Sequence, residues 1–303
     1  MGLALLVGIA MGTAAAAAQQ GLMGPRELQA LTAGTPDATL RYRRDSQQFG
    51  ELRLPARAGP LPVVVLIHGG CFKSAYATLS DLAPMADALK AAGIATWTIE
   101  YRRLGNAGGG WPGTCRDVGA AIDHLRAIAP RHRLDLRRVA VVGHPAGGHL
   151  AMWAAARGRL PRGSGVGSAD PLRPVGAIDL AGPYDMRENI ADDHRECRDP
   201  VITRMLSGTP KEVPERYVQA SAGALLPLGV RHALIWGEHE TFMPLPLARD
   251  YVRRARAAGD DAVLRVVPGA GHFEIASPQS SAWPVVLAEI RRLLGDDPAA
   301  PRS

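Results

Sequence analysis

The chain has 303 residues, of which 47% are hydrophobic and 21% are charged, and its formal net charge is +6. This length and apolar content exclude a disordered chain and a small disulfide-stapled domain, and they suffice for one large α/β domain. The positive charge lies in scattered pairs such as Arg102-Arg103 and Arg291-Arg292. Nucleic-acid binding typically needs a continuous basic patch, so we expect no nucleic-acid partner.

Residues 1–18 resemble a secretory signal peptide. An apolar run from Leu3 to Ala10 precedes a stretch of small residues that ends at Ala18, as is typical before a cleavage site. The usual positively charged start is missing, so a misassigned start codon and an alanine-rich disordered tail are the alternatives. This run is too short to span a membrane, and no other stretch is long and apolar enough. We therefore expect a periplasmic or secreted protein, with a cytoplasmic one as the alternative, and a linker over residues 19–37.

Strand-like and helix-like segments alternate from residue 38 to residue 294. The expected strands cover 38–54 (one or two strands), 62–67, 94–101, 138–142, 175–180, 232–236 and 262–267. The expected helices cover 80–92, 114–128, 146–156, 245–258 and 283–294. This alternation predicts an α/β fold with a mostly parallel sheet and helices on both faces. A polar, proline-rich stretch over 183–229 is expected to form a small cap-like insertion, and 295–303 a disordered tail.

The chain has three cysteines, Cys71, Cys115 and Cys197. An odd number allows one disulfide and one free thiol in an exported protein. Their spacing fits no zinc site.

Unusual residues follow the first buried strand, where ligands of a parallel sheet bind. The sequence there is His68-Gly69-Gly70-Cys71. Adjacent glycines let the backbone approach a ligand closely and point N–H groups at it. This pattern is typical of an oxyanion loop, and a plain glycine turn is the alternative.

A second such site lies between the strand 138–142 and the helix 146–156. The sequence Gly143-His144-Pro145-Ala146-Gly147 fits the nucleophile elbow G-x-S-x-G at every position except the middle one, which is proline. Two glycines permit the sharp strand-to-helix turn. His144 is interpreted as a packed residue rather than a metal ligand.

Two further strand ends carry a carboxylate and a histidine. Glu240 follows the strand 232–236, and His272 lies on a glycine-rich loop after the last strand. A carboxylate can orient a histidine, and a histidine so placed can act as general base. The alternatives are a solvated loop acid and a non-catalytic loop histidine, but the chain order nucleophile, acid, base favours the catalytic interpretation.

With these motifs, residues 38–294 resemble an α/β-hydrolase of the secreted esterase and feruloyl-esterase-like group, near the hormone-sensitive-lipase-like and kynurenine-formamidase-like enzymes. The matching stretches are 68–70, 105–118, 143–150, 237–244 and 271–272. This resemblance implies hydrolysis of small-molecule carboxylic esters or amides by a Ser-His-Asp/Glu site, without metal or other cofactor. It also implies that His272 is general base and acid and that Glu240 orients it. The implied oxyanion donors are the N–H groups of Gly70, Cys71 and Ala146.

Pro145 departs from this family pattern at the nucleophile. Proline has no hydroxyl to attack a carbonyl carbon, fixes φ near about −65° and has no N–H. It suits the first turn of a helix. We therefore expect a relaxed turn with Pro145 at the start of the helix, an N–H of Ala146 that is misaimed, and impaired hydrolysis.

Three alternatives remain for the function. The chain is a pseudoenzyme that binds a ligand without turnover, or it carries a recent loss of serine in an otherwise intact esterase, or it uses a substitute nucleophile. Cys71 beside the expected cavity is the main candidate for that substitute, although a packed small residue whose backbone N–H matters is the favoured interpretation of it. The other candidates are Ser74 and a water molecule activated by His272.

Overall fold

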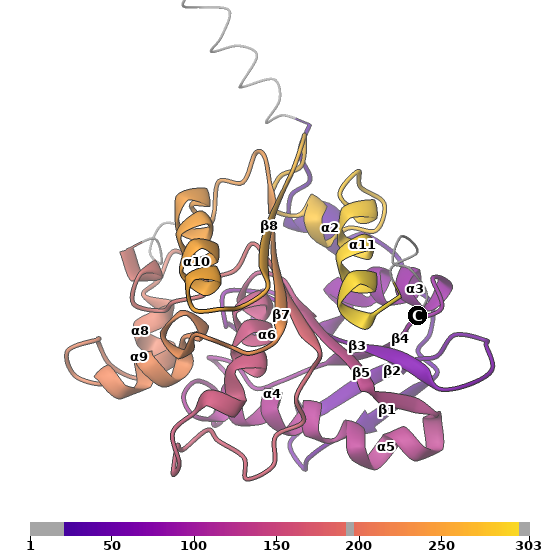
Figure 1. The fold of residues 1–303 in the computed structure, drawn as a ribbon, viewed down its shortest axis with the longest axis horizontal. Coiled ribbons are helices and arrows are strands. Elements are labelled where there is room, and N and C mark those ends of the chain that lie inside the picture. Colours follow the sequence, from indigo (N-terminus) through magenta and orange to yellow (C-terminus); the bar gives the residue numbers. More distant parts are fainter. Residues whose placement is uncertain (1–20, 192–196, 297–303) are drawn as a thin grey trace, which may run out of the picture.

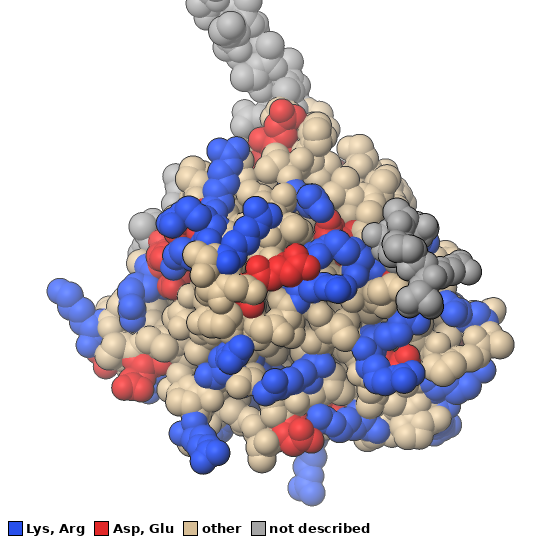
Figure 2. Space-filling view, in the orientation of Figure 1, with Lys and Arg blue, Asp and Glu red and all other residues tan. Residues whose placement is uncertain are grey.

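The computed structural model of the chain describes residues 21–191 and 197–296. The segments expected to be a signal peptide and most of the C-terminal tail lie outside the described residues. Within the described ranges, no helix is long and apolar enough to cross a lipid bilayer. Figure 2 shows Lys and Arg side chains scattered over one face and interspersed with Asp and Glu.

A single sheet of the described chain organises the fold, with the strand order β1-β2-β4-β3-β5-β6-β7-β8. The strands are β1 (Ala38–Arg41), β2 (Phe49–Arg53), β3 (Leu61–Ile67), β4 (Ala95–Ile99), β5 (Leu134–Gly143), β6 (Gly176–Leu180), β7 (Arg231–Gly237) and β8 (Ala262–Val267). The β1–β2 and β2–β4 pairs are antiparallel, and every other pair is parallel. This confirms the predicted mostly parallel sheet.

Helices cover both faces of the sheet, as predicted. They are α2 (Pro25–Gln29), α3 (Ala83–Ala91), α4 (Gly113–Asp123), α5 (Leu125–His132), α6 (Ala146–Ala156), α8 (Val201–Leu206), α9 (Pro214–Ala220), α10 (Leu245–Ala257) and α11 (Trp283–Leu294), with 3-10 turns η1 (Leu79–Leu82), η2 (Arg157–Arg159), η3 (Asn189–Ala191), η4 (Ala222–Leu225) and η5 (Glu274–Ala276). In Figure 1, α10 and α11 lie on opposite sides of β7 and β8. The helix expected over 114–128 is in fact two helices, α4 and α5, divided at His124.

The apolar run of β3 shows how one strand supports both layers. Val64 and Leu66 belong to the core cluster that includes α3 and α11. Their neighbours Val63 and Val65 belong to the second cluster, with α4 and α5. Successive side chains of a strand point to opposite faces, so an uninterrupted apolar run is what a strand covered on both faces requires.

Two segments outside the regular alternation also contribute structure. Residues 183–229, the expected cap-like insertion, include η3, α8, α9 and η4. Within residues 19–37, the segment expected to be a linker, Pro25–Gln29 form α2, which packs on the domain. The Leu28 side chain of α2 is only 3% exposed and lies in the same core cluster as Leu82 and Met85.

Candidate active site

The loops that follow β3, β5, β7 and β8 border one cavity of about 770 Å³. It is lined by the Gly69–Cys71 loop, by His144, Pro145 and Ala146, and by His272. Parallel strands end at the same edge of a sheet, which is why loops distant in sequence meet here. The residues selected from the sequence are thus brought together, with Glu240 placed behind His272.

His272 and Glu240 form a buried pair. The distance from His272 Nδ1 to Glu240 Oε2 is 2.7 Å, and their side chains are 5% and 1% exposed. The other carboxylate oxygen, Glu240 Oε1, accepts hydrogen bonds from the N–H groups of Phe242 at 2.6 Å and Met243 at 3.0 Å. A carboxylate held in this way keeps the proton on Nδ1, so the lone pair of a neutral imidazole is on Nε2. This is the arrangement that a general base needs.

His144 joins the elbow to the loop that carries His272. Its Nε2 lies 2.9 Å from the carbonyl oxygen of His272 and donates to it, and the two ring centroids are 4.7 Å apart. Burial, with the neighbouring His272 ring, holds the pKa of His144 well below its usual value. His149 is also buried, which lowers its pKa to about 4. Across the described ranges, no group of three or more His, Cys, Asp or Glu side chains could hold a metal ion.

The strand-to-helix turn keeps its tight packing although its middle residue is proline. Pro145 has φ −75° and ψ −41° and immediately precedes α6, the relaxed turn that the sequence predicts. A Cβ atom added to Gly143 would lie 2.0 Å from the carbonyl oxygen of Gly147, and one added to Gly147 would lie 1.8 Å from that of Ile67. No side chain fits at either glycine, so the elbow remains pressed against β3.

The loop after β3 has the backbone of an anion-binding turn. Gly70, Cys71 and Phe72 all have positive φ, at 92°, 53° and 53°. Among the hydrogen bonds of the described residues, none is donated by the N–H groups of Gly70, Cys71 or Ala146. Successive N–H groups in such a turn form a concave anion site, and these three are available to a bound ligand.

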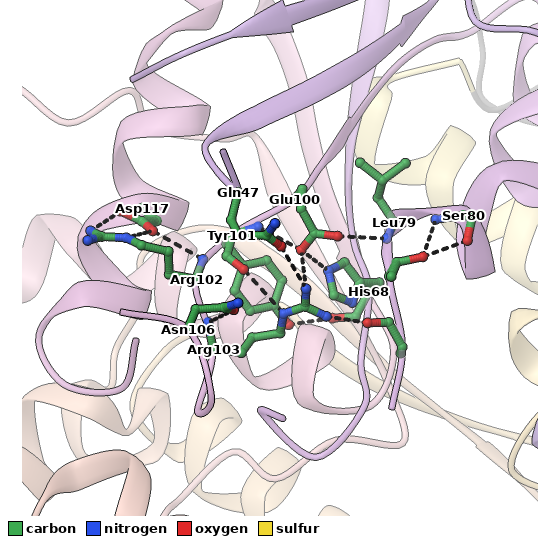
Figure 3. Close-up of polar contacts among 12 residues, drawn as sticks. Gln47, His68, Leu79, Ser80, Glu100, Tyr101, Arg102, Arg103, Asn106 and Asp117 are labelled. Carbon is green, nitrogen blue, oxygen red and sulfur yellow. Dashed lines mark hydrogen bonds and ion pairs between the residues drawn. The ribbon is translucent and has the colours of Figure 1, made fainter. Parts of the chain in front are cut away.

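A buried polar network lies under this loop (Figure 3). Glu100, 3% exposed, accepts from His68 Nε2 at 2.9 Å and pairs with Arg103 Nη2 at 2.9 Å. Its two oxygens also accept from the N–H groups of Leu79 and Tyr101. Burial alone would raise the pKa of Glu100, but His68 and Arg103 hold it below its usual value. An ionised Glu100 therefore anchors the start of the loop.

The sequence reasoning missed Glu100, Arg103 and a third buried group, Asp179. Glu100 follows β4 directly, and Arg103 lies in the same short segment. Charged residues just after a buried strand could therefore have indicated both. Asp179 is fully buried at the end of β6, and its Oδ1 accepts from the N–H of Gly182 at 2.7 Å. Burial, together with the nearby Glu240 carboxylate, raises the pKa of Asp179 well above its usual range. A single acidic residue inside a predicted strand gave no distinctive signal.

Cys71 is not a substitute nucleophile in this structure. Its sulfur forms a disulfide with Cys197, with Cα atoms 5.8 Å apart, and a nucleophilic cysteine must be a thiolate. The free cysteine, Cys115, is buried, and that burial raises its pKa to about 12. The odd cysteine number thus resolves into one disulfide and one free thiol.

Comparisons with known proteins identify the family to which the chain belongs. The BD-FAE family model matches residues 51–227, more than half of the chain. Esterase LipC of Mycobacterium tuberculosis is 28% identical over 257 residues, covering 77% of this chain and 59% of LipC. This chain therefore spans about three fifths of the length of that relative.

Two solved structures show the same fold. A truncated carbohydrate esterase from gut microbiota has a TM-score of 0.72 at 22% identity and covers 90% of this chain and 100% of its own. Esterase B from Lactobacillus Rhamnosis has a TM-score of 0.73 at 17% identity, with coverages of 95% and 92%. Together with the mostly parallel sheet, these likenesses confirm the predicted α/β-hydrolase fold.

Proposed function

The chain belongs to the BD-FAE family, a group of esterase-like α/β-hydrolases, and on that premise we propose that it is an ester-binding protein with impaired hydrolysis. In this assignment His272 is the general base and acid, and Glu240 orients it. The N–H groups of Gly70 and Cys71 bind the oxyanion, and that of Ala146, which the Pro145 turn is expected to misaim, contributes less than theirs. Pro145 stands where the nucleophilic hydroxyl is needed, so the covalent acyl-enzyme step is lost.

One observation carries this proposal: His272, paired with Glu240, lines the same cavity as Pro145, a residue with no hydroxyl. Without a nucleophile, the oxyanion donors and binding alone typically leave about 10³–10⁴-fold acceleration over water. A single oxyanion donor contributes roughly 3 kcal/mol to transition-state stabilisation. We therefore expect residual turnover far below that of a serine esterase.

A second candidate function, ligand binding without turnover, is favoured by the cavity itself. The cavity keeps a volume of about 770 Å³ although the nucleophile is absent, and volumes of 300–1,000 Å³ are usual for small-molecule sites. A bound ester would occupy it with its carbonyl at the oxyanion loop.

The Cys71–Cys197 disulfide supports a further proposal, that this protein works in the periplasm or outside the cell. Disulfides persist in oxidising compartments and are rare in the cytosol.

The test compares hydrolysis of p-nitrophenyl butyrate by the full chain and by its Pro145→Ser variant. Pro145→Ala is the matched control, since it removes the ring without adding a hydroxyl, and Pro145→Ser/His272→Ala removes the base. We expect a rise of about 10²-fold or more in kcat/KM for Pro145→Ser only. Equal, serine-esterase-like rates for the wild-type chain and Pro145→Ala would refute impaired hydrolysis. Ester binding without turnover in every variant would favour the second candidate.

A further inference from the structure

Two arginines line the candidate active-site cavity and have no charged partner among the residues that the structure describes. The charged Lys, Arg, Asp and Glu side chains that line it in the described ranges are Arg26, Asp81 and Arg198. The Asp81 carboxylate already accepts from Gln29 Nε2 at 3.1 Å and lies 3.5 Å from the N–H of Thr78. Neither arginine side chain has an ion pair or hydrogen bond to a described residue, and both are exposed. The cavity therefore has two available cations at its edge.

Arg26 is held at the cavity by the short helix α2. Gln29 Nε2 donates to the carbonyl oxygen of Tyr76 at 3.0 Å, just beyond the oxyanion loop. At the other end, the N–H of Met23 donates to Glu274 Oε1, and Glu274 Oε2 accepts from the N–H of Gly271 at 3.0 Å. Thus α2 is tied both to the segment after the oxyanion loop and to the loop of His272.

Arg198 is held at the cavity from the cap-like insertion. The preceding residue, Cys197, is joined to Cys71 of the oxyanion loop, and Lys73 Nζ donates to the Cys197 carbonyl oxygen at 3.2 Å. Lys73 also pairs with Asp199 at 3.1 Å. Between these fixed neighbours, Arg198 has φ 54°, a left-handed conformation that non-glycine residues seldom adopt. Such strain persists only where the surroundings impose it, and it concentrates at functional sites.

We propose that Arg26 and Arg198 bind an anionic group of the ligand, so that this cavity selects esters that carry a carboxylate away from the ester bond. Half-esters of dicarboxylic acids are the simplest ligands of this kind. Guanidinium groups recognise carboxylates through paired N–H donors. The net charge of +6 also raises the local concentration of anions around the protein.

This assignment deepens the proposed function, because it names the substrate class of the same cavity. The ester carbonyl lies at the oxyanion loop and the carboxylate at the arginines. Exposed ion pairs are weak, so we expect each arginine to change affinity about two- to fivefold.

The test uses the full-length protein with the Pro145→Ser substitution. Its substrates are two esters with acyl groups of equal length, mono-p-nitrophenyl glutarate and p-nitrophenyl valerate. Replacing both arginines, Arg26→Gln/Arg198→Gln, should raise KM for the glutarate about four- to twentyfold and leave its kcat and the valerate KM unchanged. Arg249→Gln, an exposed arginine outside this cavity, controls for net charge. Added salt should weaken only the preference for the glutarate.

Equal KM values for the two esters, or equal effects of the double variant on both, would overturn the assignment while leaving the proposed function standing. If Pro145→Ser hydrolyses neither ester, the proposed function fails. Ligand binding, measured by calorimetry on the wild-type chain, then tests the arginine site by itself. The probes are then monomethyl glutarate and methyl valerate. Tighter binding of the glutarate that is lost in the double variant supports the arginine site, and equal binding refutes it.

Discussion

Glu100→Gln tests whether the network under the oxyanion loop stabilises the fold. In the wild-type chain the Glu100 carboxylate is paired with Arg103, whose side chain is only 2% exposed. Glutamine keeps the shape of the Glu100 side chain and one acceptor oxygen, but it leaves the buried Arg103 guanidinium without this counter-charge. Removing one partner of a buried ion pair typically costs about 3–5 kcal/mol. Because the amide oxygen still accepts, we expect the lower end, about 3 kcal/mol.

Thermal unfolding provides the assay. In a domain of this size each kcal/mol shifts Tm by about 2 °C, so Glu100→Gln should lower Tm by about 6 °C at pH 7. The matched control is Glu188→Gln, which removes the exposed carboxylate paired with Arg254. Surface pairs of this kind contribute at most about 1 kcal/mol, so its shift should stay within about 2 °C.

The pH dependence of the Tm difference separates an electrostatic effect of Glu100→Gln from a purely steric one, which would not change with pH. The pKa of Glu100 is lowered in the folded chain, so its stabilising contribution is complete above the usual glutamate pKa of about 4.3. That contribution is lost as the pH falls through the lower, folded pKa. The Tm difference between wild type and Glu100→Gln should therefore be constant above the usual glutamate pKa of about 4.3 and shrink as the pH falls below it. An equal Tm at pH 7, or a difference that stays constant into acid, would refute the reasoning.

Two further variants test the disulfide and the elbow. Cys197→Ser removes a link across 126 residues of sequence and should lower the free energy of unfolding by about 2–4 kcal/mol. Dithiothreitol should lower the Tm of the wild type to that of Cys197→Ser and leave the Tm of the variant unchanged. Gly147→Ala forces a Cβ atom to 1.8 Å from the Ile67 carbonyl oxygen and should abolish soluble expression or cooperative unfolding. Gly165→Ala, where the nearest atom is 3.9 Å away, is its control, and equal behaviour of the two variants would contradict the packing argument.

The sequence predicted those parts of the fold that depend on periodicity and local chemistry. The apolar run of β3 predicts a strand covered on both faces, and the structure confirms this. The helix 146–156 was predicted to the residue, because Pro145 fixes its start. The Pro145 turn followed from the same property, since a locked φ leaves little conformational choice.

The missed features depend on contacts between distant segments. Cys71 lies 126 residues from Cys197, and spacing alone does not choose among three possible cysteine pairs. The role of α2 was missed because a five-residue helix carries too little periodicity to be recognised. Its position depends on contacts with distant segments: Gln29 donates to the Tyr76 carbonyl oxygen, the N–H of Met23 donates to Glu274, and Leu28 lies in the main core cluster.

The packing around Pro145 shows how the turn between β5 and α6 keeps its shape with proline at this position. A Cβ atom on Gly69 would lie 2.3 Å from both the Pro145 Cδ atom and the His144 carbonyl oxygen, so the oxyanion loop rests directly on this turn. His144 in turn donates to the His272 carbonyl oxygen. These contacts use backbone atoms and neighbouring side chains, and none of them needs a hydroxyl at position 145. Proline satisfies the turn geometry because the φ of −75° at this N-cap position of α6 lies close to the value of about −65° that its ring imposes. The packing that shapes the site therefore does not depend on the side-chain atom that the proposed chemistry would use, so Pro145→Ser tests the proposed function without rebuilding the turn.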